Sequence, residues 1–384
     1  GLRDAPSAGR CSGASRPSTG LRCAMVGALH QPVKALVARV KGLPAMNARN
    51  TTSAVSVALT LLLAAGALTC LGLMVGDGTL RWPWGLTSDP ITAEIIWQIR
   101  APRSIGAWAA GALLGLAGAI AQAIFRNPLA DPYLLGSSSG AALAVAIALA
   151  LASWLGADVS GAAFWGGFMA FGLTGAAFTG ALLAVILTVT LAGGVAQGTR
   201  LLLGGVVVGV VLGALTSFMT FIAPNVLLNM QGFMLGSTAL LNWSAVGRLL
   251  VVGAICMAIA ATFAKPLDAL QLGERTARSL GIPLSQVNAI YILLLATVTG
   301  AAVAHTGLIA FVGLAAPHVV RAWLPCQHRA LLLLSSLTGG VLLLGADALA
   351  RLIFSPMELP TGLLTALLGG GYLLWRMGKV GRLS

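Results

Sequence analysis

Residues 201–222 read LLLGGVVVGVVLGALTSFMTFI, a run without a single charged side chain. A helix of about 20 residues spans the hydrocarbon core of a bilayer, whereas a strand of a membrane barrel needs only about 10 and alternates apolar with polar residues. The run is too long and too uniformly apolar to be such a strand. It therefore predicts a membrane-spanning helix.

The rest of the chain has the same character. Of its 384 residues, 58% are hydrophobic and 9% are charged, and the mean hydropathy is +0.92. These values lie far outside the range of soluble domains. The 49 glycines favour closely packed helices, because helix association in lipid depends on close backbone approach. The composition predicts an all-α polytopic membrane protein.

Ten apolar segments are predicted to cross the membrane. They are residues 52–76, 103–125, 138–157, 163–192, 200–222, 244–264, 285–304, 306–322, 329–350 and 360–377. The segment 306–322 is short and interrupted by glycine and proline, and Pro224–Leu241 is predicted to form a short extra helix. Broken helices at membrane depth normally line a cavity, so both are candidates for the wall or gate of a transport pathway.

The basic residues are distributed asymmetrically about these segments. The formal net charge is +13, but the charge lies in alternate loops, which argues against a nucleic-acid partner. With the N-terminus inside, 18 Lys and Arg residues fall on the cytoplasmic side and five on or near the other face. The positive-inside rule then predicts a multi-pass protein with both termini in the cytoplasm and with membrane lipid around it.

The chain divides into two predicted regions. Residues 1–50 are rich in Arg, Ser, Ala and Gly without a sustained apolar run, which predicts a disordered, basic cytoplasmic extension. Residues 51–380 are predicted to form the ten-helix transmembrane domain. The five cysteines show neither metal-ligand spacing nor a pairing pattern, so we interpret them as structural and expect no metal site.

One charged segment interrupts the apolar sequence, from Lys265 to Pro283. Glu274 and Arg278 stand four residues apart with the acid first, the spacing of a helical ion pair. Gly281 and Pro283 are expected to end the helix. The segment, at about 267–283, is therefore predicted to be helical, to face water and to contact another protein.

Six motifs occur in a fixed order along the apolar chain. They are Arg100-Ala-Pro-Arg103; Gln122 to Gly136 with Ser139-Gly-Ala behind it; Leu272 to Pro283; Gly307 to Arg321; Gly345-Ala-Asp-Ala-Leu-Ala-Arg351; and Glu358 to Gly369. Together they resemble the FecCD-type permease subunits of bacterial ABC importers for ferric siderophores, haem and vitamin B12. The resemblance covers about residues 55–377. It departs from the family pattern at Gly369-Gly-Gly-Tyr372, where Gly-Ala-Pro is usual.

The resemblance implies a type II ABC importer permease in the bacterial inner membrane. It further implies a homodimer of ten-helix chains that works with two ATP-binding cassette subunits and a periplasmic substrate-binding protein. The coupling segment, 267–283, then supplies the coupling helices that contact the ATPase.

Site residues are carried over by matching motifs. The residues implied are, for ATPase coupling, Leu272, Gly273, Glu274, Arg275, Arg278 and Gly281; for docking of the binding protein, Arg100, Arg103 and Arg351; and for the cytoplasmic gate, Asn127, Leu129, Gln197 and Gly198. Arginine suits docking because its planar fork can hold a carboxylate through two hydrogen bonds and stays charged.

The chain is not expected to be an enzyme. The phosphate-loop pattern Gly-x-x-x-x-Gly-Lys-Ser/Thr does not occur in the sequence, so ATP is expected to bind a partner subunit. No set of Ser, His and Asp residues or of metal ligands suggests catalysis. No permanently bound cofactor is expected.

The alternative from another class is an ion-coupled secondary transporter, with Asp347 as proton carrier. Because Arg351 stands four residues after Asp347, a local ion pair is the simpler interpretation of this acid. His305 and His318 could in principle ligate haem iron, but a pathway that releases its cargo gains little from strong ligation. The favoured cargo is haem; a ferric siderophore or vitamin B12 is the alternative within the family.

Overall fold

The computed structural model describes residues 48–76, 79–80, 90–154, 167–195, 198–353 and 358–380. The predicted extension, residues 1–50, lies outside this part of the chain except for its last three residues. Gln197 of the predicted gate also lies outside it. The described part is helical throughout, apart from connecting turns and a two-residue antiparallel pair in which β1 (Val75–Gly76) faces β2 (Thr79–Leu80).

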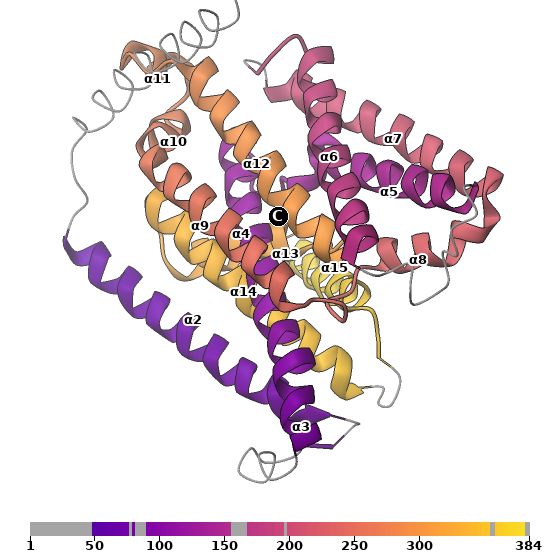
Figure 1. Ribbon diagram of the computed structural model, residues 1–384. Helices are drawn as coiled ribbons and strands as arrows, with labels where there is room; N and C mark the ends of the chain where they lie inside the picture. Colours follow the sequence, from indigo (N-terminus) through magenta and orange to yellow (C-terminus); the bar gives the residue numbers. More distant parts are fainter. Residues whose placement is uncertain are drawn as a thin grey trace, which may run out of the picture. The chain divides into compact units, whose positions relative to one another are not determined.

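Each of the ten predicted spans contains a helix (Figure 1), and eight helices of the described residues are long and apolar enough to cross a membrane. In chain order these helices are α2 (Ala48–Met74), α4 (Ala101–Phe125), α5 (Ser137–Trp154), α6 (Gly167–Leu191), α7 (Gly198–Ile222), α9 (Trp243–Thr262), α12 (Leu284–Thr306), α13 (Val312–Trp323), α14 (His328–Ile353) and α15 (Thr361–Val380). The polytopic all-α prediction is therefore confirmed.

Shorter elements connect these helices. They are α3 (Pro90–Ile95), the π-helix η2 (Ile96–Arg100), the 3-10 helices η3 (Pro132–Leu135) and η4 (Pro224–Val226), α8 (Leu227–Leu235), α10 (Ala264–Gln271) and α11 (Glu274–Ser279). The predicted extra helix in Pro224–Leu241 corresponds to η4 and α8. The charged segment predicted as helical forms two helices, α10 and α11.

The eighth predicted span is wrong in extent. Its helix, α13, starts at Val312 and has 12 residues, about 18 Å at 1.5 Å per residue, too short to cross a bilayer core of about 30 Å. The cause is a break at Gly307–Phe311, where both terminal residues have positive φ, 67° and 68°. Backbone groups at and next to the break pair with the end of α8 and the connection after it, since Leu308 N donates to Phe233 O at 3.0 Å and Ser237 N donates to Thr306 O at 2.8 Å.

Helix α4 lies at the centre of the bundle, against α2, α9, α12, α13 and α14 (Figure 1). In α4, 21 of the 25 residues are buried, whereas only four of the 25 residues of α7 are buried and its surface is covered with exposed valine and leucine. The apolar surface of α7 is suited to lipid or to another apolar helix.

Glycine brings α4 against its neighbours. A Cβ added at Gly118 would collide with the backbone of Gly313 in α13, and one added at Gly115 or Gly111 would collide with the backbone of α14. At these positions the helices touch backbone to backbone.

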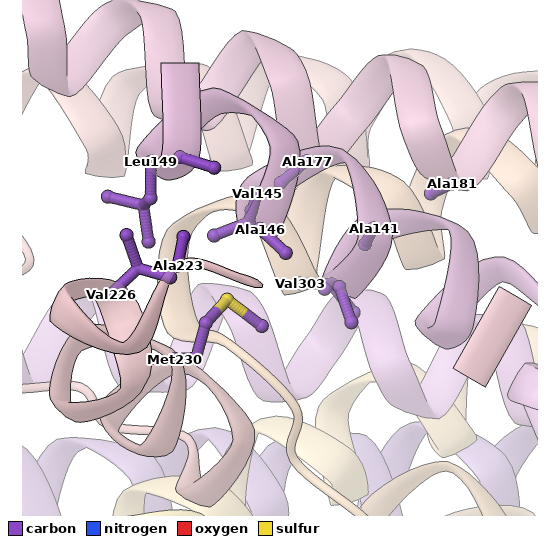
Figure 2. Close-up of a cluster of buried hydrophobic side chains, with 12 residues drawn as sticks. Ala141, Val145, Ala146, Leu149, Ala177, Ala181, Ala223, Val226, Met230 and Val303 are labelled. Carbon is purple, nitrogen blue, oxygen red and sulfur yellow. The ribbon is translucent and has the colours of Figure 1, made fainter. Parts of the chain in front are cut away.

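A cluster of buried apolar side chains joins α5, α6 and α12 to η4 and α8 (Figure 2). Met230 of α8 is buried between Val226 of η4 and Val303 of α12, close to Val145 on α5. The flexible thioether fills the irregular space between these elements. The cluster fixes the short helices, and with them the connection that pairs with the break before α13.

Candidate functional site

Two groups of charged side chains lie at opposite ends of the bundle. The end at which α11 lies is called the α11 end, and the end at which α3 lies is called the α3 end (Figure 1). Helix α4 joins them, because Arg103 is in its first turn and Arg126 follows its last residue. The sequence-predicted site residues are divided between these two ends.

At the α11 end, three side chains form the exposed charge cluster, Arg126, Glu274 and Arg278. Arg126 Nη2 lies 2.7 Å from Glu274 Oε1, and Arg278 Nη2 lies 3.6 Å from Glu274 Oε2. The three side chains are 43%, 35% and 63% exposed. The helical pair predicted from the spacing is present, but the closer partner of Glu274 is the residue after α4.

The two predicted coupling helices are held differently. Helix α10 is seated in the bundle: Leu267 and Leu270 are buried, and Asp268 accepts hydrogen bonds from the backbone N–H of His328 at 2.9 Å and from its ring at 2.8 Å. Helix α11 is anchored through buried Ala277 and presents its remaining side chains to solvent.

The other predicted coupling residues lie on this exposed surface. Arg275 is exposed, and Leu272 is exposed although it is a large apolar residue. Gly273 and Gly281 bound the helix with φ of 103° and 74°, a backbone conformation that glycine adopts without strain. The coupling residues therefore form one continuous surface at the α11 end.

The turn after α4 carries two predicted gate residues. Arg126 begins it in the left-handed conformation, with φ 49°. Asn127 Oδ1 then accepts the N–H of Leu129 at 2.9 Å, a local bond that asparagine favours in turns. The Leu129 side chain is 57% exposed.

The far end of this turn is fixed in the protein. Asp131 Oδ1 accepts the N–H of Tyr133 at 2.8 Å, and Tyr133 Oη donates to Ile309 O at 3.1 Å. Burial raises the pKa of the Asp131 carboxyl above its usual value, although the bond from Tyr133 opposes the shift. The turn is thus anchored at its α5 side.

A polar pocket of about 310 Å³ lies beside the turn. It is lined by Ile124, Phe125, Arg126, Gly198, Thr199, Leu202 and Glu274. The structure thus brings Gly198 of the predicted gate next to Glu274 of the predicted coupling surface. Asn127 and Leu129 do not line this pocket, although they directly follow Arg126.

At the α3 end, four side chains form the buried charge cluster, Arg103, Asp347, Arg351 and Glu358. Asp347 Oδ1 accepts a hydrogen bond from Arg103 Nε at 3.0 Å, and Asp347 Oδ2 lies 2.7 Å from Arg351 Nη2 as an ion pair. Arg103 Nη1 also reaches both carboxylate oxygens of Glu358, at 2.8 and 2.9 Å. Asp347 is fully buried and both arginine side chains are at most 7% exposed, whereas Glu358 is half exposed.

Neutral groups complete the environment of Asp347. Thr238 Oγ1 donates to Asp347 Oδ1 at 2.5 Å and shares a hydrogen bond with Thr361 at 3.0 Å. Arg351 also donates to Gly72 O at 2.8 Å. The cluster therefore connects α2, α4 and α14 with the start of α15, and every member of it is hydrogen-bonded, as buried charges require.

The three predicted docking residues differ in accessibility. Arg103 and Arg351 are buried in this cluster, whereas Arg100 at the end of η2 is partly exposed and donates to Leu73 O at 3.2 Å. The structure brings all three to the α3 end. Arg100 is the member of the set that solvent reaches.

The two histidines considered for haem are in contact with other side chains. Arg248 Nε donates to His305 Nε2 at 3.0 Å, and the His318 ring lies 6.1 Å from the Tyr372 ring. Within the described residues, no group of three or more His, Cys, Asp or Glu side chains could hold a metal ion.

A family model matches residues 61–379 of this chain, and its description is the FecCD transport family. The match runs from the middle of α2 to the end of α15. The chain belongs to the FecCD transport family. It is thus a permease of an ABC importer, and the recognition made from the six motifs is confirmed.

Named relatives of this FecCD family member align over most of their length. The hemin transport system permease protein HmuU of Yersinia pestis is 36% identical over 83% of this chain and 92% of its own. The cobalamin import system permease protein BtuC of Halobacterium salinarum is 35% identical over 78% and 80%. The vitamin B12 import system permease protein BtuC of Salmonella paratyphi A is 33% identical over 87% and 97%.

A solved structure shares the fold of this FecCD family member. It is described as an inward-facing conformation of a metal-chelate type ABC transporter, and it is 28% identical with a TM-score of 0.73. The match covers 84% of this chain and 99% of that one. The type II importer architecture expected from the motifs is confirmed.

Three residues that contact the predicted sites of this FecCD family member were missed from the sequence. Arg126 and Glu358 are the ion-pair partners of Glu274 and Arg103. Asn288 Nδ2 donates to Val195 O at 3.2 Å, just before the second gate segment, which is the predicted gate pair Gln197 and Gly198. Arg126 and Glu358 stand inside quoted motifs. Their charge in an almost uncharged chain was the signal that could have identified them.

Proposed function

We propose that this chain passes haem across the bacterial inner membrane, from a periplasmic binding protein to the cytoplasm, driven by a separate ATPase. The observation that carries the proposal is the exposed coupling surface of α11, next to the turn after α4 and the pocket at Gly198. A ferric siderophore or vitamin B12 is the alternative cargo. Haem is favoured because the hemin permease of Yersinia pestis is 36% identical over 92% of its length.

The assembly we propose is a homodimer with two ATP-binding cassette subunits at the α11 end. The α11 end faces the cytoplasm in this proposal, because the basic loops of the chain collect there. Both termini are then cytoplasmic, and residues 51–380 form the permease domain. The exposed surface from Leu272 to Gly281 is the surface offered to the ATPase.

The binding protein docks at the α3 end in this proposal. Arg100 supplies the accessible guanidinium, and Arg103 and Arg351 lie beneath it with their charges already shared with acids. An acidic side chain of the binding protein gains most from Arg100, since a buried pair must be broken before the other two arginines can bind it.

The docking proposal predicts an asymmetric mutational response. Arg100→Glu should weaken binding of the purified binding protein to the permease at least tenfold, because it replaces attraction by repulsion. Gln98→Ala, an exposed neutral position on the same turn, is the control and should leave the affinity within about twofold. Equal affinity of Arg100→Glu and wild-type permease would count against docking at this face.

Uptake into proteoliposomes tests the function itself. The vesicles contain this chain and its co-purified ATPase, and they receive binding protein loaded with hemin, a ferric siderophore or cobalamin. Uptake of hemin that requires both ATP and the binding protein supports the proposal, whereas uptake of one of the other cargoes replaces haem by that cargo. If uptake instead follows a proton gradient without ATP, the importer mechanism is wrong.

A further inference from the structure

The exposed charge cluster joins two parts of the chain that are 148 residues apart, the turn after α4 and the first residue of α11. Arg126 ends α4 in the left-handed conformation, so its side chain leaves the helix axis at the point where the chain turns. Glu274 starts α11 directly after Gly273, whose φ is 103°. The ion pair at 2.7 Å is therefore a bond between two chain reversals.

The two ends of the turn are held in different ways: its start continues from the end of α4, and its far end is held by side-chain bonds to other elements. Between Asp131 and Gly136 it is fixed by the bonds of Asp131 and Tyr133 and by Thr188 Oγ1, which donates to Leu135 O at 2.9 Å. At Arg126 the side-chain bond to another element is the pair with Glu274. The pocket beside Arg126 leaves space into which the pair can move.

The second gate segment is tied to the same region. Asn288 in the second turn of α12 donates to Val195 O at 3.2 Å, just before the segment that leads to Gly198. Helix α12 follows α11 after a short connection, Leu280–Pro283. One side-chain bond thus links the α11–α12 region to the turn after α4, and one links it to the residue before the second gate segment.

From this geometry we infer that Arg126 is a positioning residue that transmits movement of α11 to the turn at Asn127–Leu129. Closure of the ATPase on α11 displaces Glu274, and Arg126 pulls the exposed residues of the turn that follow it while the Asp131 end stays fixed. The inference rests on the proposed coupling role of α11. It assigns to Arg126 a role that is separate from contact with the ATPase.

The first test measures cargo transported per ATP hydrolysed in the reconstituted complex. Arg126→Gln should lower this ratio at least fivefold while the ATPase still co-purifies and the melting temperature stays unchanged. Arg126→Lys, which keeps the charge, should recover part of the ratio. The double variant R126E/E274R should recover more of it than either of its single changes, because the opposite charges face each other again. Arg200→Gln, an exposed arginine at the start of α7, is the control and should stay within about twofold of wild type.

A second test follows the movement directly in variants with single reporter cysteines, Leu129→Cys on the turn and Thr276→Cys on exposed α11. The background has its five native cysteines replaced by alanine and retains uptake. Labelling by a thiol reagent is compared without nucleotide and with ATP and vanadate. In Arg126→Gln, we expect the nucleotide-dependent change at Leu129→Cys to disappear while the change at Thr276→Cys remains.

The outcomes separate this inference from the proposed function. If Leu129→Cys responds equally with and without the Arg126→Gln change, or if that change leaves the transport ratio intact, the inference is wrong and the proposed function stands. If Thr276→Cys does not respond to nucleotide even with Arg126 present, α11 does not couple to the ATPase, and the inference fails together with the proposed coupling.

Discussion

The two ends of α4 carry arginine–carboxylate pairs of similar length and opposite surroundings. At the α3 end, Arg103 and Arg351 hold Asp347 at 3.0 and 2.7 Å with all three side chains at most 7% exposed. At the α11 end, Arg126 holds Glu274 at 2.7 Å with both side chains more than a third exposed. The distance between the charges therefore does not by itself determine how much an ion pair contributes to stability. Burial makes the first structural, and exposure leaves the second free to move.

The largest effect is expected from Asp347→Ala, which leaves two buried guanidinium groups without their shared counter-charge. Breaking a buried ion pair from one side destabilises a protein by about 3–5 kcal/mol. We expect a large fall in the melting temperature of the purified permease and a low yield of folded protein. A variant with wild-type thermal stability would show that the buried charge cluster is not a structural element.

Asp347→Ala also tests the ion-coupled alternative. A proton carrier must exchange its proton during transport, whereas Asp347 is fixed by two arginines and Thr238. If the variant folds and retains uptake driven by ATP, Asp347 carries no proton in the cycle. If ATP has no effect in the wild-type protein and proton-driven uptake is lost in the variant, the assignment of the cluster as structural is wrong.

A smaller effect is expected from Glu358→Gln, which removes the half-exposed acid of the same cluster. Arg103 keeps Asp347 as its partner, and exposed pairs contribute about 0–1 kcal/mol. The melting temperature should therefore fall far less than in Asp347→Ala. An equal fall in melting temperature in the two variants would show that burial does not decide how much each acid contributes to stability.

For Arg126→Gln at the α11 end, we expect a loss of unfolding free energy below about 1 kcal/mol. High salt should reproduce part of the change in the wild-type protein, because exposed charges are screened while buried ones are not. Cargo transported per ATP should then fall with rising NaCl in the wild type and stay flat in Arg126→Gln. Thermal melting at two salt concentrations serves as the control for unfolding.

The smallest change in stability is expected for Asp131 at the α11 end. Its carboxylate accepts a hydrogen bond from a backbone N–H rather than from an arginine. Burial raises its pKa in the folded protein, so stability is lost as the pH rises through the folded pKa. Asp131→Asn keeps a side-chain oxygen that accepts the Tyr133 N–H. Because asparagine does not ionise, the variant does not lose stability as the pH rises. We expect the variant to melt slightly higher than wild type at pH 7 and not higher below about pH 4.

The sequence predicted the helices well because each apolar run carries its own signal. The helix prediction failed at α13. The run 306–322 is apolar, but its first residues pair with the end of α8 and the connection after it instead of continuing a helix. That pairing depends on two segments about 70 residues apart, so no local pattern contains it. No local pattern predicted η2 either, the π-helical turn that extends α4 towards the α3 end.

The charge pairs show the same division between local and distant information. The i,i+4 pairs of Asp347 with Arg351 and of Glu274 with Arg278 follow from helical spacing, and both are present. The pairs with Arg103 and Arg126 span 244 and 148 residues and follow only from the fold. The docking, gate and coupling roles given to these residues stay predictions, which the experiments above address.

The glycine contacts of α4 limit how the bundle can rearrange. Backbone packed on backbone at Gly111, Gly115 and Gly118 leaves no side chains that could change rotamer to let the helices slide. We therefore expect α4, α13 and α14 to move as one rigid body through a transport cycle. We expect the hinge to lie outside this unit, and α7, in which only four of 25 residues are buried, is a helix of the described chain that can rotate more easily.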